Sequence, residues 1–452
     1  MKTSSKIVAV LAFGLLSHLQ AQNNSENTPN DSSKDSENTE KIITLKGQVD
    51  GLNETLLETK ATVDKLAKIK VSGYIQAQWQ HTDTNGAASV AGGAFPANSE
   101  QRFQIRRGRL KTTYETPTSK YVLQFDVIPT GLSLKDAYVS IMEPWLKIAS
   151  FTMGVFDRPF GYEISLSSST RESPERSRVY QTLFPGERDM GAKLEIAPPS
   201  ELGMLQYFNL KGGVVTGMGP NLNEIDAEQD YVGRVGFQAP FYALNLSLDG
   251  GFSMYRGKVL AVNDTAFSIG DTSFLRTTGN QRHVFDRNVM GVDAQLYYDI
   301  PVLGGMSLRG EYLWGEIPGV AGSSSPYAAA TAPIYNRKVM GWYGMLVQNF
   351  GTKVQGILKY DVYDPNTDVE GSNVKPIVGV AIPGQTALSP TDLMYTTFGY
   401  GATFYWDESV RFTIYHDIIA NEKASSLATG SALPFISDRK DNVFTFRMQA
   451  KF

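Results

Sequence analysis

The sequence predicts an all-β protein, a transmembrane antiparallel β-barrel of about 16 strands preceded by a short N-terminal coiled-coil helix. Three observations predict it. After residue 70, apolar and polar residues alternate over segments of about ten residues, the length of a tilted membrane strand. Aromatic residues gather at the ends of the apolar faces. Short connections, such as 407–409, alternate with long polar ones, such as 364–393, as in outer-membrane barrels.

The first residues have the features of a secretory signal. Lys2 and Lys6 precede an apolar stretch at 7–16, and Ala21 supplies a small residue for cleavage. The apolar stretch is too short to span a bilayer as a helix. We therefore expect residues 1–21 to be a signal peptide.

The next segments differ in composition. Residues 22–40 contain no large apolar side chain, so we expect a disordered polar linker. Residues 41–69 are expected to form a periplasmic coiled-coil helix, because eight positions recur at alternating spacings of three and four. These positions are Ile42, Leu45, Val49, Leu52, Leu56, Thr59, Val63 and Leu66. A single amphipathic helix folded onto the following domain is the alternative. The core residues follow the pattern that favours a dimer.

Residues 70–452 form the predicted barrel. In 289–299, one face is apolar and the other holds Asp293 and Gln295, and similar alternation recurs in 306–314, 353–362 and 394–406. A soluble β-sandwich would also alternate, but the strand length, the aromatic positions and the alternating connections favour a membrane barrel. The segment 442–452 ends on Phe452 without a following turn. We expect it to close the barrel against a first strand near 71–80, which removes the unpaired edges.

The run 102–111 contains five basic side chains within ten residues. Its apolar face changes from odd-numbered to even-numbered residues, which indicates a β-bulge near Arg107-Gly108. With that bulge, the side chains expected to face the lumen are Arg102, Arg106, Arg109 and Lys111. Cations along one wall would form a path for anions. Alternatively, these cations merely offset lumenal carboxylates such as Asp126 and Asp136.

A second basic cluster lies in the long segment that follows the strand at 145–156. It contains Arg171, Arg176 and Arg178, and Pro174 fits the first turn of a short helix. A long loop early in a barrel is a candidate to fold inward and narrow the pore. An ordinary surface loop is the alternative.

These stretches resemble the phosphate-selective porin O/P family. The resemblance rests on the run 102–111, Leu134-Lys-Asp-Ala-Tyr-Val-Ser, and the segments 156–161 and 185–191, in that order. It extends over roughly residues 70–452. It implies a sixteen-stranded trimeric porin with a basic constriction, and anion-lining roles for Arg102, Arg106, Arg109, Arg171, Arg176 and Arg178. A trimer conflicts with the dimer that the heptad pattern favours.

The leading functional hypothesis is an outer-membrane porin of a Gram-negative bacterium, with its N-terminal segment in the periplasm. It would let small anions, phosphate foremost, diffuse passively. A general diffusion porin with weak selectivity and an envelope-tethering protein are the alternatives. We expect no enzyme, cofactor or metal site, because none of the four histidines belongs to a recognisable catalytic constellation. The net charge of −4 implies no nucleic-acid partner. The expected partners are membrane lipid, small anions and two further copies of the chain.

Overall fold

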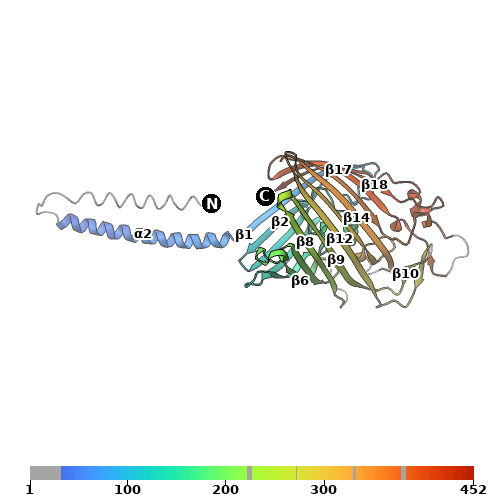
Figure 1. Ribbon diagram of the computed structural model, residues 1–452, viewed down its shortest axis with the longest axis horizontal. Coiled ribbons are helices and arrows are strands. Elements are labelled where there is room, and N and C mark those ends of the chain that lie inside the picture. The colour runs from blue at the N-terminus through green and yellow to red at the C-terminus, as the bar shows by residue number, and fades with distance from the viewer. Residues whose placement is uncertain (1–31, 221–226, 271, 329–331, 378–382) are drawn as a thin grey trace. The chain divides into compact units, whose positions relative to one another are not determined.

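The computed structural model describes residues 32–452 apart from 221–226, 271, 329–331 and 378–382 (Figure 1). The expected signal peptide, residues 1–21, lies outside the described residues, as do residues 22–31 of the expected linker. Internal contacts divide the chain into two units between Ala67 and Lys68. Within the described ranges, no helix is both long enough and apolar enough to cross a membrane.

Helix α2 spans Ser32–Leu66. It begins within the segment expected to be a disordered linker, so the boundary predicted at residue 40 lies too far along the chain. Glu and Lys have unbranched side chains that lose little conformational freedom in a helix. In addition, Glu37 forms an ion pair at 2.7 Å with Lys41, one turn later. The apolar heptad residues are exposed on this single chain. The coiled coil therefore stays a prediction.

The second unit is a closed antiparallel barrel of 16 strands, as predicted (Figure 1). In chain order, which is also the order around the barrel, the strands are β1 (Ile69–Thr82), β2 (Gln101–Glu115), β3 (Ser119–Ile128), β4 (Gly131–Met142), β5 (Ala149–Asp157), β6 (Arg188–Ile196), β7 (Phe208–Val215), β8 (Asp230–Phe241), β9 (Leu246–Leu260), β12 (Val284–Ile300), β13 (Gly304–Gly319), β14 (Ile334–Phe350), β15 (Val354–Asp364), β17 (Tyr395–Tyr405), β18 (Val410–Asn421) and β19 (Val443–Lys451).

The remaining elements lie in the connections. They are the strands β10 (Ala266–Ile269), β11 (Phe274–Thr277) and β16 (Gln385–Thr386), the helix α3 (Arg178–Leu183), and the 3-10 turns η1 (Glu163–Ser165), η2 (Ser200–Tyr207), η3 (Tyr242–Leu244), η4 (Pro326–Ala328), η5 (Gly371–Asn373), η6 (Pro390–Asp392) and η7 (Gly430–Phe435). Helix α3 begins at Arg178, so Pro174 does not lie in its first turn as the sequence suggested. Pro174 belongs instead to an irregular stretch that offers its carbonyl to arginines.

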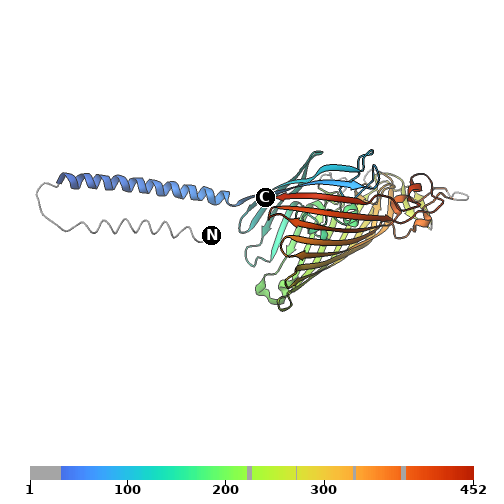
Figure 2. The ribbon, with the colours of Figure 1, turned by 90° about the horizontal axis from the view of Figure 1, so that it is seen from above.

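The barrel closes where β19 pairs with β1. Their register runs from Tyr74 opposite Lys451 to Thr82 opposite Val443. Figure 2 shows the two strands side by side, with β19 in red and β1 in blue. The predicted closure is confirmed, and no strand of the barrel is left with an unpaired edge.

Connections at the two ends of the barrel differ in length, as predicted. One end, here called the short-turn end, carries turns such as 301–303, 351–353 and 406–409. The other, the long-loop end, carries the connections 158–187, 261–283, 365–394 and 422–442, with a short exception at 129–130. Several of the long loops are packed. Their buried side chains form an apolar cluster that includes Phe267, Phe274, Leu393 and Phe435.

Two strands contain a β-bulge that adds a charged side chain to the lumen. Gln76 lies opposite Arg107 and Ala77 lies opposite Ile105, so Arg106 is the extra residue of β2. The predicted bulge is thus confirmed, one residue earlier than Arg107-Gly108. The second bulge, which the sequence analysis did not find, makes Lys135 the extra residue of β4.

We predict that Gly108→Ala destabilises the barrel by about 1–3 kcal/mol. A Cβ atom at Gly108 would lie 2.4 Å from the carbonyl oxygen of Val127, so strand β3 would have to shift. The matched control is Gly344→Ala on β14, where a Cβ would meet no atom within 4 Å. Urea unfolding of both variants in detergent micelles checks this. Equal unfolding midpoints would contradict the prediction.

Candidate functional site

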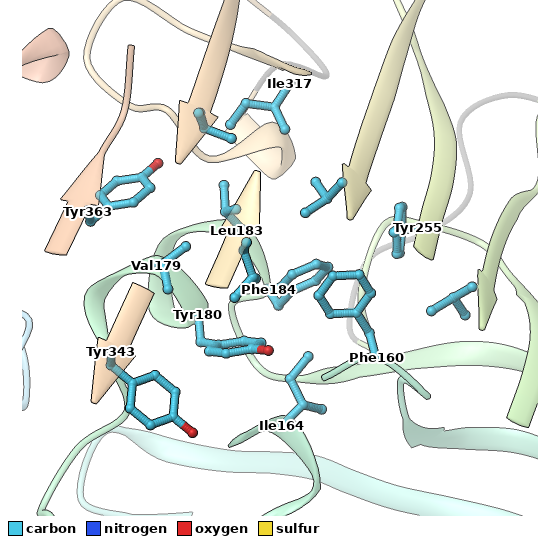
Figure 3. Packing of buried hydrophobic residues seen from close by; sticks show 14 of the residues in the cluster. Phe160, Ile164, Val179, Tyr180, Leu183, Phe184, Tyr255, Ile317, Tyr343 and Tyr363 are labelled. Atoms are coloured by element: carbon cyan, nitrogen blue, oxygen red, sulfur yellow. The ribbon is translucent and has the colours of Figure 1, made fainter. Parts of the chain in front are cut away.

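The connection 158–187 between β5 and β6, here called the inward loop, folds into the barrel. Its apolar side chains Phe160, Ile164, Val179, Tyr180, Leu183 and Phe184 are all about 1 % exposed. They pack against wall residues such as Tyr255, Ile317 and Tyr343 (Figure 3). Burial of an apolar side chain of this size contributes about 1.5–3 kcal/mol. The predicted inward folding is confirmed, and the main apolar core of the barrel unit lies inside its lumen.

The start of the inward loop is fixed by one buried carboxylate on β13. The backbone amides of Tyr162 and Glu163 donate to Glu311 at 2.7 and 2.6 Å. The hydroxyls of Tyr180 and Tyr343 donate to the same carboxylate at 2.5 and 2.6 Å. A buried carboxylate requires such donors, and here they come from both the loop and the wall.

Four glutamates of the inward loop form ion pairs with cations on five strands of the wall. The pairs are Glu163 with Lys359 at 2.8 Å, Glu172 with Arg309 at 2.7 Å, Glu175 with Arg106, Arg107 and Arg447 at 2.9, 2.7 and 2.9 Å, and Glu187 with Arg188 at 2.8 Å. These cations belong to β2, β6, β13, β15 and β19. The loop is therefore tied around much of the circumference of the barrel.

Glu175 has the largest number of cationic partners among these glutamates. Its side chain is 8 % exposed. Burial alone would raise the pKa of its carboxyl, but Arg106, Arg107 and Arg447 outweigh burial and hold this pKa well below its usual value. Since the folded-state pKa lies below the unfolded one, the stabilisation is complete above the unfolded pKa and is lost only as the pH falls through the folded one. The loop thus stays tied at neutral and mildly acidic pH.

The predicted site residues of β2 mostly have partners. Arg106 pairs with Glu175, and Arg109 pairs with Asp126 at 3.4 Å. Arg102 lies nearer the long-loop end, where it donates to Gln80 at 2.7 Å and stacks 4.1 Å over the ring of Phe95. For Arg106 and Arg109, the alternative that they offset carboxylates fits the geometry better than a free cationic surface.

Lys111 differs from these arginines. Among the described residues, no carboxylate lies within the 4 Å that defines an ion pair with it. It lines a cavity of about 400 Å³ toward the short-turn end, together with Asp136, Asp157 and Lys193. Lys111 is thus a lumenal cation that is left available to a solute.

The three predicted arginines of the inward loop do not form one cluster. Arg171 is 3 % exposed and donates to the carbonyls of Ser173 and Pro174. Arg176 forms an ion pair with Glu187 and donates a hydrogen bond to the carbonyl of Leu166 at 2.7 Å. These two side chains hold the loop in shape.

Arg178 stacks 4.0 Å from the ring of Tyr395, near the long-loop end of β17. The described residues place no carboxylate in ion-pair contact with it. Arg178 therefore lies toward the long-loop end, and the described contacts give it no partner in common with Arg171 or Arg176.

Sequence reasoning missed several lumenal cations, of which Lys135 is the clearest case. In the register of the sheet, Lys111 lies opposite Gln124, which in turn lies opposite Asp136, the neighbour of Lys135. The two lysines are therefore two strands apart, about 10 Å between backbones. Within the described chain, Lys135 also has no carboxylate in ion-pair contact. After Leu134, the apolar residues of β4 change from even-numbered to odd-numbered positions. This change was the signal that could have revealed the bulge.

Comparisons with known proteins support the fold. No family model matches the sequence, and no curated protein matches it. The solved structure of OprB from Pseudomonas putida is 11% identical with a TM-score of 0.56, over 87% of this chain and 96% of that chain. The anion-selective porin from Comamonas acidovorans is 12% identical with a TM-score of 0.49, over 85% and 99%. The likeness to OprB shows that the chain has the barrel fold of outer-membrane porins, while the phosphate-selective O/P family remains a resemblance.

We predict that Glu175→Gln loosens the inward loop. Breaking a buried ion pair by removing one partner costs about 3–5 kcal/mol, because the other charges are left buried and unpaired. The population of detached loop should rise at least about a hundredfold. Trypsin, which cleaves after arginine, should then cut at Arg171 or Arg176 correspondingly faster in detergent-solubilised protein.

The matched control is Glu201→Gln, which removes an exposed carboxylate at the short-turn end. It should leave the rate of loop cleavage unchanged. If Glu175→Gln were as resistant to trypsin as the control, the ion pairs would not be what holds the loop.

Proposed function

We propose that this chain is an outer-membrane channel through which small anions, phosphate among them, diffuse passively. A barrel of this strand number is too wide for wall side chains alone to fill. The inward loop narrows the lumen, and non-covalent contacts hold it against the wall. The observation that supports the anion preference is the pair of lumenal lysines, Lys111 and Lys135, which form no ion pair with a carboxylate of the described residues.

The paired arginines contribute less to this preference. The pairs of Arg109 with Asp126 and of Arg309 with Glu172 are each neutral, so their field on a passing ion is weak. Arg106, Arg107 and Arg447 share the one carboxylate of Glu175 and keep a net positive charge, but Arg107 and Arg447 are buried behind the loop. The two lysines differ because neither forms an ion pair with a carboxylate of the described residues. A lysine ammonium offers three donors to a phosphate or carboxylate oxygen. Passage also requires weak binding, which two separated lysines supply better than a closed arginine cage.

The proposal includes the setting of the channel. The signal peptide exports the chain, α2 lies in the periplasm as a coiled coil, and the barrel assembles as a homotrimer. The short-turn end then faces the periplasm, since α2 leads directly into the first residues of β1. The resemblance to the phosphate-selective O/P family and the exposed heptad residues support this setting. A general diffusion porin with weak selectivity is the alternative.

We predict that the channel is anion-selective in a KCl gradient and that millimolar phosphate reduces its chloride current. Lys111→Glu and Lys135→Glu should each lower the anion-to-cation permeability ratio by at least about fivefold, because one charge at contact in water is worth about 1 kcal/mol and each substitution changes the charge by two. The reversal potential of single channels in planar bilayers measures this ratio.

The control for charge alone is Lys440→Glu, an exposed lysine in the connection 422–442. It should leave the reversal potential unchanged. A cation-selective wild type, or equal shifts in all three variants, would overturn the anion proposal and leave a general diffusion porin.

A second candidate function is an envelope tether, favoured by the exposed apolar residues of α2. Deleting residues 23–68 distinguishes the two. We expect conductance to persist, because Lys68–Phe452 form a compact unit of their own. Sensitivity of the producing cells to detergent is the second readout. An increase in that sensitivity with unchanged conductance would assign a tethering role to α2, and loss of conductance would contradict the channel proposal as stated here.

A further inference from the structure

Two carboxylates face the lumen near the long-loop end of strands β15 and β18. In the register of the sheet, Gly399 of β17 lies opposite Lys359 on one side and opposite Asp417 on the other. Asp361 follows Lys359 by two residues and so points to the same face. The two carboxylates repel each other, and no cation of the described residues lies within ion-pair distance of either. Lys359 itself is engaged by Glu163 at 2.8 Å.

The hydroxyl of Tyr415 lies beside these carboxylates and is 2 % exposed as part of its residue. A Cβ atom at Gly399 would collide with the hydroxyl oxygen, so this oxygen lies over Gly399, next to Asp417. Neither the hydroxyl nor Oδ1 of Asp361 meets a hydrogen-bond partner in the part of the chain that the structure describes. Buried polar groups almost always have such a partner. The arrangement therefore calls for a donor from outside the chain.

A cation of the inward loop borders the same site. The guanidinium of Arg178 stacks 4.0 Å over the ring of Tyr395. Tyr395 lies two residues, about 7 Å of strand, from Thr397, which is opposite Asp361. Arg178 attracts both Asp361 and Asp417, and its buried Nε has no hydrogen-bond partner among the described residues. A guanidinium of this kind is suited to bind a carboxylate.

Oxygen acceptors beside a guanidinium fit a ligand that carries both signs of charge. A primary ammonium has three N–H donors. The site offers three groups that accept, the carboxylates of Asp361 and Asp417 and the hydroxyl of Tyr415. A metal ion fits less well, because the described ranges contain no group of three or more acidic, His or Cys side chains that could hold one. Asp417 and Arg178 are only half-buried, so the lumen reaches both ends of the site.

We propose that this site binds a small zwitterion whose ammonium and carboxylate lie close together, the chemistry of a free amino acid. The ammonium contacts Asp361, Asp417 and Tyr415, and the carboxylate contacts Arg178. Two charge-assisted hydrogen bonds of about 2.8 Å, joined through the two bonds that separate an α-ammonium from its carboxylate carbon, extend over a length similar to the 7 Å or so between the two levels. The inference goes beyond the proposed anion channel and does not rest on its selectivity.

Isothermal titration calorimetry of the full chain in detergent micelles tests the proposal. The probes are L-alanine, ethylammonium, which is alanine without its carboxylate, and propionate, which is alanine without its ammonium. We expect alanine to bind once per chain and at least about tenfold more tightly than either fragment, because each fragment lacks one set of charge-assisted hydrogen bonds. Calcium chloride, as the fourth probe, should bind no more tightly to the wild type than to the Asp417→Asn variant.

Three variants assign the two ends of the site. Asp417→Asn and Tyr415→Phe should each lower the affinity for alanine and ethylammonium at least about fivefold and leave propionate binding unchanged. Arg178→Gln should lower the affinity for alanine and propionate and leave ethylammonium binding unchanged. The matched control is Asp299→Asn, which removes an exposed carboxylate at the short-turn end of β12 and should change none of the affinities.

Three results would overturn the proposal. The first is a wild type that binds alanine no more tightly than the two fragments. The second is an Asp417→Asn variant with unchanged alanine affinity and a higher melting temperature, which would mean that the two carboxyl groups share a proton. The third is calcium binding that Asp417→Asn abolishes, which would assign the carboxylates to a metal ion. If Asp417→Asn does not fold, Tyr415→Phe decides the matter, because it keeps the ring and removes only the hydroxyl.

Discussion

The neutralisation of lumenal arginines by the glutamates of the inward loop is the interaction on which the rest of the barrel unit depends. A closed sheet of this size encloses more space than its own side chains fill. The chain fills part of that space with residues 158–187, and apolar packing on one side of the loop holds it there. Its glutamates then meet cations from five strands. Loop position and lumenal charge are therefore set by the same contacts.

Such an arrangement favours a defined geometry more than stability. Desolvating a carboxylate and an arginine costs free energy that their attraction only partly returns. What the pairs provide is selectivity for one loop position, because any other position would leave buried charges without partners. In the proposed channel, Lys111 and Lys135 act on solutes, because neither forms an ion pair with a described carboxylate. The proposal therefore assigns a structural role to the arginines that pair with the loop and a role in permeation to the two lysines.

The sequence predicts the barrel better than its interior. Alternation with a period of two, the connection lengths and the basic run all follow from local residue order, and closure, strand number and the β2 bulge agree with them. The partners of the arginines do not follow from local order. Arg107 meets Glu175 from 68 positions away, and Arg447 meets it from 272. Lys135 escaped notice because only one basic residue marks this bulge, and the change of apolar positions after Leu134 was not followed up.

The seam between β1 and β19 has a consequence for how the molecule is assembled. Gln76 on β1 and Gln449 on β19, 373 positions apart, hydrogen-bond across it at 2.7 Å. Arg447, which completes the shell around Glu175, lies on β19. The inward loop precedes Arg447 by more than two hundred residues in the chain. Its final contacts therefore form only when the last strand has joined the sheet. Contacts of such long range slow folding. Barrel closure and formation of the constriction therefore belong to one late step. A barrel in which β1 and β19 have not yet paired does not have the complete constriction.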